Sequence, residues 1–357
     1  MKPATREGAV LMSGNEAIGE AAIRAGCASY YGYPITPQNE LTAYMSARMP
    51  EEGRVFIQAE SELAAINMVY GSSAAGMRAM TSSSSPGIAL KQEGISYLAG
   101  SELPAVIVNI ARGGPGLGNI SGAQGDYWQS VKGGGHGDYR TIVVAPASVQ
   151  EAVELTGLAF DLADRYRMPA IVLGDGYLGQ MMEPVTFPDL SPAPDLPEKD
   201  WAVTGAAGRP SRIVRSLMME DNSLEEHNML MLERYHRIEE KETRWEAIDV
   251  DDADVVMVAY GLPARICRSV IADGRREGLR LGMIRPITLW PFPTVPIRKA
   301  AEKVRGVLVV EMSTGQMVED VRLAVEGRCP VDLYGRTGGN LPSSEVIMDK
   351  CRKLVGA

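Results

Sequence analysis

The segment RVFIQAESELAAINMVYGSSAAGMRAMTS, residues 54–82, places a helical pattern between two short apolar runs. We predict a strand over Arg54–Ala59, a helix over residues 61–75 and a second strand over Arg78–Ser82. A strand followed by a helix and another strand is the unit from which parallel sheets are built. When this unit recurs along a chain, helices cover both faces of the sheet, so the segment predicts an α/β fold.

The same alternation continues on both sides of this segment. Helices are expected after Ser13 and after Ser148, and Ser148 and Glu151 have the spacing of a capping box. The further strands that we expect are Val10–Met12, Pro104–Ile110, Thr141–Ala145 and Pro169–Gly174 in the first half of the chain, and Asp254–Tyr260, Arg280–Ile284, Gly306–Glu311 and Pro330–Tyr334 in the second.

A different kind of sequence separates the two strand-rich halves. Residues 183–213 are rich in proline and predict an extended connector. Residues 221–247 form a charged helical pattern, which fits either a solvated helix between domains or an arm that grips a partner. We therefore predict a first domain over 1–185, a linker with a helical segment over 186–250, and a second α/β domain over 251–357.

Composition places the chain among globular proteins. Of its 357 residues, 45% are hydrophobic and 23% charged, and we find no apolar run of the ~18 residues that a membrane-spanning helix needs. The net charge of −9 argues against nucleic acid or an anionic membrane as the main partner. Met1–Glu7 reads as the approach to a strand and not as a signal peptide. We therefore expect a cytoplasmic protein.

The cysteines do not form a recognisable ligand set. Cys27, Cys267, Cys329 and Cys351 are scattered, and no pair has CxxC spacing. We therefore do not expect this chain alone to hold zinc or an iron–sulfur cluster.

Glu62 stands at the head of the apolar stripe of the predicted helix. It shares one helix face with small and apolar residues, namely Ala65, Ile66, Val69 and Ser73. A carboxylate in that position must be buried, paired or capping, because an unpaired buried charge is costly. The spacing by itself is also explained by a carboxylate in the first turn, where the helix dipole favours negative charge. Glu60, two residues earlier, is the fallback candidate.

Thr36 lies in a stretch that proline makes rigid. In Tyr33-Pro-Ile-Thr-Pro37 the residue that precedes the second proline is biased to an extended conformation. The loop follows the first predicted helix, so we expect it to hold the Thr36 hydroxyl at one edge of the sheet. A stiff connector without a functional hydroxyl is the alternative.

Two glycine-rich loops each have one residue that could bind a ligand, Arg112 at the first and His136 in the second. Arg112 follows the predicted strand Pro104–Ile110 and precedes Gly113–Gly118, and arginine suits a carboxylate or phosphate. Local sequence fits a flexible loop equally well. His136 stands among glycines at 133–137. A lone histidine is usually structural, but the glycines expose this one, so we consider a role in substrate binding.

Taken together, these residues resemble the α subunit of 2-oxoacid:ferredoxin oxidoreductases. The resemblance runs over nearly the whole chain, and it depends on the order and spacing of the pieces more than on any one of them. Its form over Gly133–Tyr139 looks most like the branched-chain (2-oxoisovalerate) type, with the 2-oxoglutarate type close behind. The matching pieces are Tyr33–Pro37, the helix of Glu62, Thr81–Gly87, Arg112 with its glycines, Gln124–Arg140, Pro291–Pro293 and Val310–Met317.

The resemblance implies a fold and a set of cofactors. The first domain would be the pyrimidine-binding domain of a thiamine diphosphate enzyme, and the second would be like the C-terminal domain of transketolases. A partner β subunit would hold the diphosphate and Mg²⁺. [4Fe-4S] clusters would lie in β and in a ferredoxin-like δ subunit, a γ subunit would complete the complex, and a second copy of the complex is expected. Ferredoxin would accept electrons, and coenzyme A would take the acyl group.

The resemblance also assigns residues to roles. Glu62 would hydrogen-bond the aminopyrimidine ring of the cofactor and favour the tautomer that takes the proton from the thiazolium ring. Thr36 and Arg112 would complete the catalytic set, with Arg112 facing the substrate carboxylate. The remaining contacts implied are to the cofactor from Pro34, Ile35 and Ser85, and to the substrate from Thr36, Arg112 and His136.

The predicted activity is the oxidative decarboxylation of a 2-oxoacid, 3-methyl-2-oxobutanoate, to acyl-CoA and CO₂. The alternatives are a member specific for 2-oxoglutarate or pyruvate, and a non-catalytic assembly subunit with the same fold. A self-sufficient enzyme of the transketolase or acetolactate-synthase kind is disfavoured. Gly174-Asp-Gly176 begins like the metal–diphosphate motif of such enzymes, but residues 199–206 supply no Asn to complete it. We therefore predict no metal site there.

Overall fold

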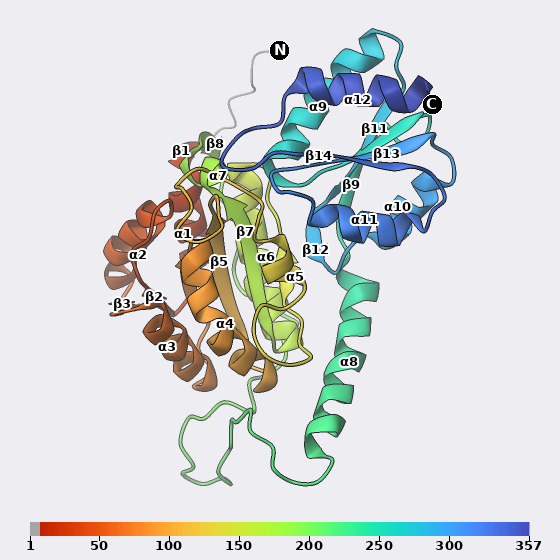
Figure 1. Ribbon diagram of the computed structural model, residues 1–357. Helices are drawn as coiled ribbons and strands as arrows, with labels where there is room; N and C mark the ends of the chain where they lie inside the picture. Colours follow the sequence, from red (N-terminus) through yellow and green to blue (C-terminus); the bar gives the residue numbers. More distant parts are fainter. Residues whose placement is uncertain (1–7, 357) are drawn as a thin grey trace.

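The computed structural model describes residues 8–356, so the stretch Met1–Glu7, on which the signal-peptide prediction rests, lies outside it. It shows two α/β domains that lie side by side, with a long helix descending along the first domain (Figure 1). No helix in the described residues is both long and apolar enough to cross a membrane.

The first domain is built on a seven-stranded sheet. Its strands stand in the order β12-β6-β7-β5-β4-β2-β3, and all neighbours are parallel except β12 and β6. The central strands β4, β5 and β7 are buried along their whole length, as expected for parallel strands covered on both faces. The strands are β2 (Ser29–Gly32), β3 (Val55–Gln58), β4 (Ala79–Ser83), β5 (Ala105–Ala111), β6 (Ile142–Val144), β7 (Pro169–Asp175) and β12 (Thr288–Trp290).

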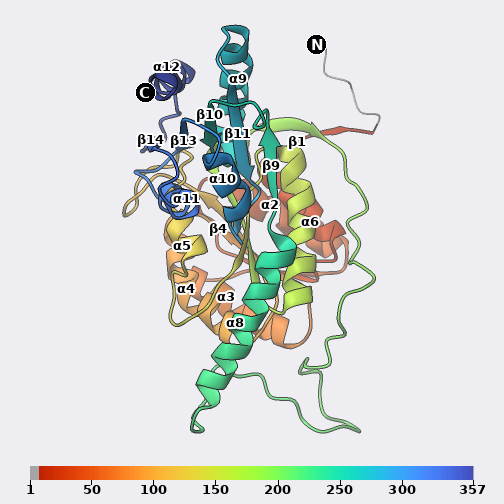
Figure 2. The same ribbon diagram turned by 90° about the vertical axis from the view of Figure 1, so that its right-hand side faces the viewer.

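Helices lie on both faces of this sheet. Seen from the side, α6 covers one face and α4 the other (Figure 2). A two-stranded antiparallel ribbon of β1 (Val10–Ser13) and β8 (Met182–Val185) closes the domain. The helices are α1 (Gly14–Arg24), α2 (Asn39–Glu51), α3 (Glu62–Ala74), α4 (Ser85–Gly100), α5 (Tyr127–Val131), α6 (Val149–Tyr166) and α7 (Gly176–Gln180).

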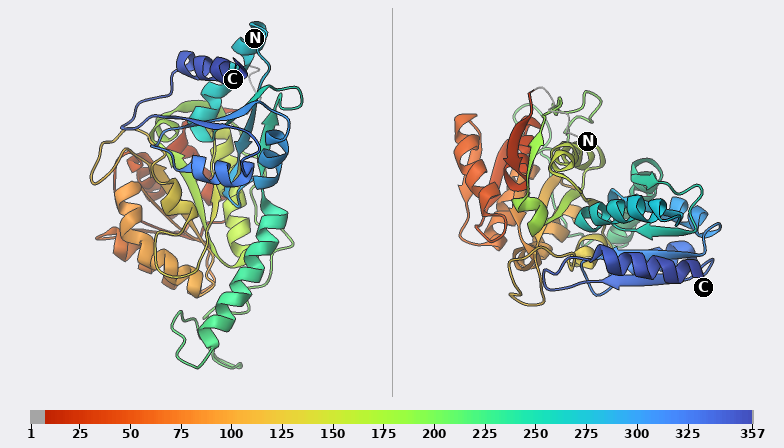
Figure 3. Two further views of the ribbon diagram at one scale, coloured as in Figure 1. Left: turned by 45° about the vertical axis from the view of Figure 1, so that its right-hand side comes forward. Right: turned by 90° about the horizontal axis from the view of Figure 1, so that it is seen from above.

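The second domain has a five-stranded sheet in the order β14-β13-β10-β11-β9, parallel except for β9. Seen from above, it stands beside the first domain rather than stacked on its sheet (Figure 3). Its elements are β9 (Trp245–Ile248), β10 (Val255–Val258), α9 (Gly261–Arg276), β11 (Leu281–Pro286), α10 (Thr294–Ala301), β13 (Gly306–Glu311), α11 (Met317–Val325), β14 (Val331–Gly335) and α12 (Ser344–Gly356).

The connector between the domains has the two parts expected from its composition. Residues 186–222 have no helix or strand, and α8 (Ser223–Glu242) follows. This helix buries one stripe, at Met231, Tyr235, Ile238 and Glu242, and most of its other residues are exposed. The charged segment therefore packs against its own chain along one face.

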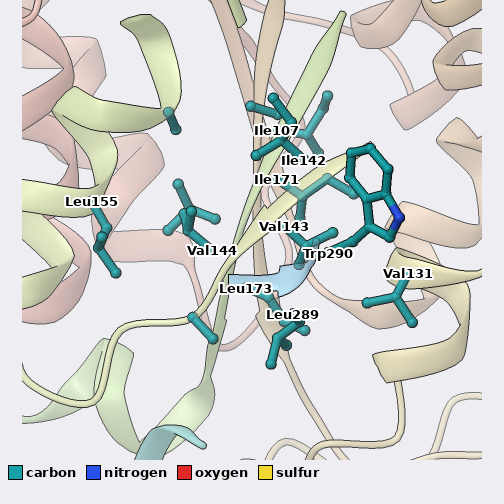
Figure 4. Packing of buried hydrophobic residues seen from close by; sticks show 14 of the residues in the cluster. Ile107, Val131, Ile142, Val143, Val144, Leu155, Ile171, Leu173, Leu289 and Trp290 are labelled. Atoms are coloured by element: carbon teal, nitrogen blue, oxygen red, sulfur yellow. The ribbon is translucent and has the colours of Figure 1, made fainter. Parts of the chain in front are cut away.

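The two domains exchange strands at their edges. Strand β9, inside the predicted linker range 186–250, pairs with the second sheet, whereas β12, inside the range 251–357, pairs with the first. Leu289 and Trp290 of β12 lie among Val131, Val143 and Leu173 of the first domain (Figure 4). The domain boundaries themselves stay predictions, but the exchange ties the domains into one unit.

The predicted strands are all present, with ends within two residues of those expected. Three elements of the first domain that lie next to the predicted site residues in the chain were not predicted, namely β2, α2 and α4. The loop Tyr33–Pro37 therefore follows β2 and not the first helix directly.

Only half of the predicted capping box at Ser148 forms. Ser148 accepts a hydrogen bond from the backbone N–H of Glu151. The Glu151 carboxylate instead accepts from the N–H of Ala147 and pairs with Arg285 of the second domain. The Glu151 carboxylate thus pairs with Arg285, which is distant in the sequence, instead of with the backbone N–H of Ser148.

Candidate active site

The predicted residues gather at the carboxyl ends of neighbouring parallel strands. The loop with Thr36 follows β2, Glu62 opens α3 after β3, Ser85 opens α4 after β4, and Arg112 follows β5. These four strands are adjacent in the order β5-β4-β2-β3. Loops at the carboxyl edge of such a sheet form the usual ligand site of an α/β domain.

The loop of Thr36 is held by side chains from three other elements. Asn15 of α1 and Gln180 of α7 both donate to the carbonyl of Pro37, at 2.9 and 3.1 Å. Gln38, fully buried, accepts a hydrogen bond from Ser82 of β4 at 2.5 Å. Pro34 is exposed and Ile35 half-buried on the same loop. The rigidity that the prolines predicted is therefore reinforced by tertiary contacts.

Arg112 joins this loop to the glycine-rich loop. Its guanidinium donates to the carbonyl of Thr36 at 2.8 Å and to that of Leu117 at 3.1 Å. Its Nε is buried and has no hydrogen-bond partner in the described residues. The Thr36 hydroxyl accepts from Asn39 at 3.2 Å. Because Arg112 also lines a cavity at this edge, its guanidinium can bind an anion there.

Glu62 is buried, with 6% of its surface exposed, and begins α3 after the cap residue Ser61. No group of the described residues hydrogen-bonds its carboxylate. The buried residues of α3 are Glu62, Ala65, Ile66, Val69 and Ser73, which is the face predicted from the sequence. Glu60, the fallback, is exposed.

The first turn of α4 lies directly against Glu62. A Cβ atom added to Gly87 would stand 2.6 Å from Glu62 Oε1 and 2.0 Å from Ser83 Oγ. Only glycine leaves room for these atoms. The hydroxyls of Ser83 and Ser84 are buried without a partner in the described part of the chain. The site thus holds a carboxylate and two hydroxyls that lack partners within this chain.

Ser85 connects the start of α4 to Arg112. Its hydroxyl donates to Asp126 at 2.7 Å and accepts from the Arg112 backbone N–H at 2.9 Å. Burial raises the pKa of the Asp126 carboxyl, while the hydrogen bonds from Ser85 and Asn109 and the charge of Arg112 oppose the rise. A cavity of about 350 Å³ opens here, lined by Arg112 and Asp126 and, from the second domain, by Met312.

His136 does not join this group. It is exposed, and its loop packs along the middle of α4, where Gly134 and Gly135 lie against Gln92. No described contact connects it to Thr36 or Arg112. Its role in substrate binding stays a prediction.

Asp175 of Gly174-Asp-Gly176 has a structural partner. Its carboxylate is buried and accepts hydrogen bonds from the N–H groups of Tyr177 and Leu178 at the start of α7. Burial raises its pKa to about 6, and these two hydrogen bonds oppose the rise. Within residues 8–356, no group of three His, Cys, Asp or Glu side chains is placed to hold a metal ion.

Comparison with known proteins identifies the family. The model of the family "Pyruvate flavodoxin/ferredoxin oxidoreductase, thiamine diP-bdg" matches residues 20–245, and that of "Pyruvate:ferredoxin oxidoreductase core domain II" matches residues 253–347. The chain belongs to the 2-oxoacid:ferredoxin oxidoreductase family. It is an oxidoreductase subunit, and its first domain is the thiamine-diphosphate-binding domain of that family.

Several full-length relatives are subunits of such enzymes. The ketoisovalerate oxidoreductase subunit VorB of Methanothermobacter thermautotrophicus is 52% identical, over 97% of this chain and 98% of that protein. The 2-oxoglutarate synthase subunit KorA of Methanothermobacter marburgensis is 36% identical, over 95% and 97%. Both names describe enzyme subunits.

Solved structures agree with the fold. The 2-oxoglutarate:ferredoxin oxidoreductase from Magnetococcus marinus, with 2-oxoglutarate, coenzyme A and succinyl-CoA bound, has a TM-score of 0.88 at 27% identity. The match covers 98% of this chain and 65% of that one. A split-gene transketolase, at 13% identity and a TM-score of 0.57, shares the fold. The predicted combination of a pyrimidine-binding and a transketolase-like domain is confirmed.

The residues at the site suit the thiamine diphosphate of this oxidoreductase family. An aminopyrimidine offers a ring nitrogen and an amino group, and Glu62 with the Ser83 and Ser84 hydroxyls offers unpartnered groups of matching chemistry. Gly87 leaves the space that the Glu62 carboxylate and the Ser83 hydroxyl occupy, because an added Cβ would meet both. A metal ion usually holds the diphosphate, and within residues 8–356 no group of three His, Cys, Asp or Glu side chains is placed to bind one.

Sequence reasoning missed several residues that build the site. Asp126 lies in the quoted motif Gln124–Arg140, but nothing in the pattern marks it as a partner of Ser85. Lys91 is fully buried on α4. Its signal was present, because it falls at helical spacing among the buried residues Ile88, Ile95 and Leu98.

Proposed function

We propose that this chain is the α subunit that binds the pyrimidine half of thiamine diphosphate in a branched-chain 2-oxoacid:ferredoxin oxidoreductase. The observation that carries the proposal is the buried Glu62 carboxylate, which has no hydrogen-bond partner in the described residues and packs against Gly87, where a larger side chain would displace it. A buried carboxylate left without a partner is costly unless a ligand satisfies it.

The residues of this chain divide the work at that edge. Glu62 holds the aminopyrimidine ring and exchanges a proton with its nitrogen. The bound cofactor supplies the electron sink for decarboxylation. Arg112, which lines the cavity, binds the substrate carboxylate through its guanidinium, and Thr36, fixed by Arg112, presents its hydroxyl beside the substrate. Ser85, Pro34 and Ile35 border the cofactor.

The cavity beside Arg112 supports a monocarboxylate substrate. Among the described residues that line it, Arg112 is the one cation, and Pro86, Ala89 and Met312 give it apolar walls. A dicarboxylate such as 2-oxoglutarate would leave its second charge without a partner there. The relatives agree, since the named ketoisovalerate subunit is 52% identical and the named 2-oxoglutarate subunit 36%. We infer 3-methyl-2-oxobutanoate as the substrate.

The rest of the reaction belongs to partner subunits. A β subunit supplies Mg²⁺ and the diphosphate site. This fits Asp175, whose carboxylate already accepts a hydrogen bond from the N–H of Tyr177 at the start of α7. β and a ferredoxin-like δ subunit hold the [4Fe-4S] clusters, a γ subunit completes the complex, and the complex pairs with a second copy. Oxidation of the oxoacid releases CO₂, sends two electrons through the clusters to ferredoxin and leaves the acyl group on coenzyme A. We place the complex in the cytoplasm.

The test is Glu62→Gln in the assembled complex, with Glu60→Gln as the matched control. We expect the Glu62 variant to lose oxoacid-dependent acceptor reduction by ~100-fold or more, the scale of general acid–base catalysis, and the Glu60 variant to keep it. Assembly is checked by co-purification of the subunits. Full activity of the Glu62 variant would mean that this chain is an assembly subunit. The kcat/KM values for 3-methyl-2-oxobutanoate, 2-oxoglutarate and pyruvate decide the substrate.

A further inference from the structure

Lys91 is a fully buried lysine on α4, the helix whose first turn borders the candidate active site. It lies on α4, has no exposed surface, and forms no ion pair with any described residue. Its ammonium donates one hydrogen bond, to the carbonyl of Ser82 at 3.1 Å. Lysine is almost never fully buried unless it is paired, because desolvating the ammonium is costly. One carbonyl does not satisfy its three donors.

Helix geometry places the Lys91 side chain beside Glu62. Lys91 is four residues after Gly87, so both lie on the same face of α4. Long side chains on a helix point back toward its N-terminus, and the N-terminal turn is where Glu62 Oε1 lies against Gly87. The Glu62 carboxylate is the charged group whose field acts on Lys91.

Lys91 is also connected to the loop of Thr36. Ser82, whose carbonyl accepts from Lys91, donates its hydroxyl to Gln38 at 2.5 Å. Gln38 in turn donates to the carbonyl of Tyr33 at 3.4 Å. One strand end therefore links Lys91 to the loop that carries Thr36.

We propose that Lys91 is a positioning residue of the cofactor site, which sets the charge beside Glu62 and thereby the pH range in which Glu62 binds the aminopyrimidine. This inference rests on the proposed function, because it assumes that Glu62 contacts the cofactor. Lys91 itself touches neither cofactor nor substrate; it acts through Glu62.

The protonation of Lys91 changes near neutral pH. Burial lowers its pKa to about 7, and the charge of Glu62 opposes the fall. The other titratable group packed against the same strand end is Tyr30 of β2, whose hydroxyl hydrogen-bonds Ser82. Burial raises the pKa of Tyr30 to about 12, so it stays neutral throughout the relevant range. Lys91 is therefore an ammonium below pH 7 and an amine above it.

The charge of Lys91 determines whether cofactor binding strengthens or weakens as the pH rises. An ammonium at Lys91 attracts the Glu62 carboxylate and repels a pyrimidine ring that takes up a proton. The neutral amine does neither, so cofactor binding strengthens as the pH rises. Between pH 6 and pH 8 the neutral fraction of a group with a pKa of about 7 rises roughly tenfold.

The experiment measures the Kd of thiamine diphosphate for the assembled complex by calorimetry at pH 6, 7 and 8, without oxoacid. Four proteins are compared: wild type, Lys91→Met, Lys91→Arg and Lys353→Met. Methionine has nearly the same length without a charge, and arginine stays charged at every pH used. Lys353 is exposed on α12 and serves as the control. Titrations in the partner subunits or in the diphosphate affect all four proteins alike.

We expect the Kd of wild type and of the Lys353 variant to fall more between pH 6 and 8 than that of Lys91→Met, by a factor of up to roughly ten. At pH 6, Lys91→Met should keep the low Kd that wild type has at pH 8. At pH 8, Lys91→Arg should keep the high Kd that wild type has at pH 6. Thermal unfolding checks that both Lys91 variants are folded; Lys91→Met removes a buried charge and should be at least as stable as wild type.

Parallel pH profiles for all four proteins would overturn the role of Lys91 while leaving the proposed function intact, provided that wild type binds the cofactor and turns over oxoacid. The role of Lys91 would also be overturned if Lys91→Met bound thiamine diphosphate more weakly at every pH but its Kd changed with pH as the wild-type Kd does. A wild-type complex that binds no thiamine diphosphate would overturn the proposed function itself.

Discussion

Arg112 donates a hydrogen bond from its guanidinium to the main-chain carbonyl of Thr36 at 2.8 Å, across 76 positions of sequence. This contact joins the loop after β2 to the loop after β5, two strands separated in the sheet by β4. It fixes Thr36 through its backbone and leaves its hydroxyl for other partners. Two of the three predicted substrate residues, Thr36 and Arg112, are therefore one structural unit.

We predict that Arg112→Lys raises the KM for the oxoacid much more than it lowers kcat. Lysine cannot reach Thr36, Leu117 and a carboxylate at once, because its ammonium is a point charge and not a planar fork. Loss of one charge-assisted hydrogen bond, about 1.5–3 kcal/mol, corresponds to a KM increase of roughly 10–100-fold. Steady-state kinetics of the complex checks this, with Arg352→Lys on α12 as the control. An unchanged KM for every oxoacid would exclude the contact.

We predict that Gly87→Ala weakens thiamine diphosphate binding by at least about tenfold. The added methyl group would stand 2.6 Å from Glu62 Oε1 and 2.0 Å from Ser83 Oγ, so both groups must move. Gly71→Ala is the matched control, because a Cβ at Gly71 of α3 meets nothing within 4 Å. Alanine is the better helix former, so that control should be stabilised by up to about 1 kcal/mol. Calorimetric titration and thermal unfolding measure the two effects. Equal cofactor affinity in the two variants would contradict this role of Gly87.

We predict that Asp175→Asn stabilises the chain at neutral pH but not near pH 4. The pKa of Asp175 rises from 3.8 to about 6 on folding, mainly through burial. Because the folded pKa is the higher one, stability is lost as the pH rises from about 4 to 6, and above pH 6 the penalty is constant at about 3 kcal/mol. Asparagine still accepts a hydrogen bond at the start of α7 without the charge. Denaturant unfolding of both chains at pH 4, 5, 6 and 7 should show a difference that grows with pH; a difference that is the same at every pH would refute this account.

Sequence patterns predicted the parts of the fold that depend on neighbours along the chain. The face of α3 with Glu62, Ala65, Ile66, Val69 and Ser73 followed from helical periodicity and is the face that is buried. Strand β2 was missed because its four residues, Ser29–Gly32, are polar or aromatic and end in glycine. Helix α4 was missed because Lys91, Gln92 and Glu93 interrupt its apolar pattern. Of these three polar residues, Lys91 falls at helical spacing with buried apolar residues, but nothing in the pattern marks Gln92 as buried.

Contacts between distant residues were not available to sequence reasoning. The Glu151 carboxylate pairs with Arg285 and not with its own helix cap. Asp126 pairs with Ser85 and Asn109, from two different strand ends. Each of these partners is chosen by the packing of whole elements, and no local spacing encodes it. The same holds for the exchange of β9 and β12 between the sheets.

The sequence by itself determined the α/β fold, the family and the candidates Glu62, Thr36 and Arg112, because periodicity, proline and glycine act over a few residues and motif order is written along the chain. Only the tertiary structure decided which groups meet. It placed Arg112 on Thr36, set Gly87 and Lys91 beside Glu62, and left His136 apart on the flank of α4. The physical reason is that hydrogen bonds and charges act over a few ångströms in space, and the sheet order β5-β4-β2-β3 brings together loops that are far apart in the chain.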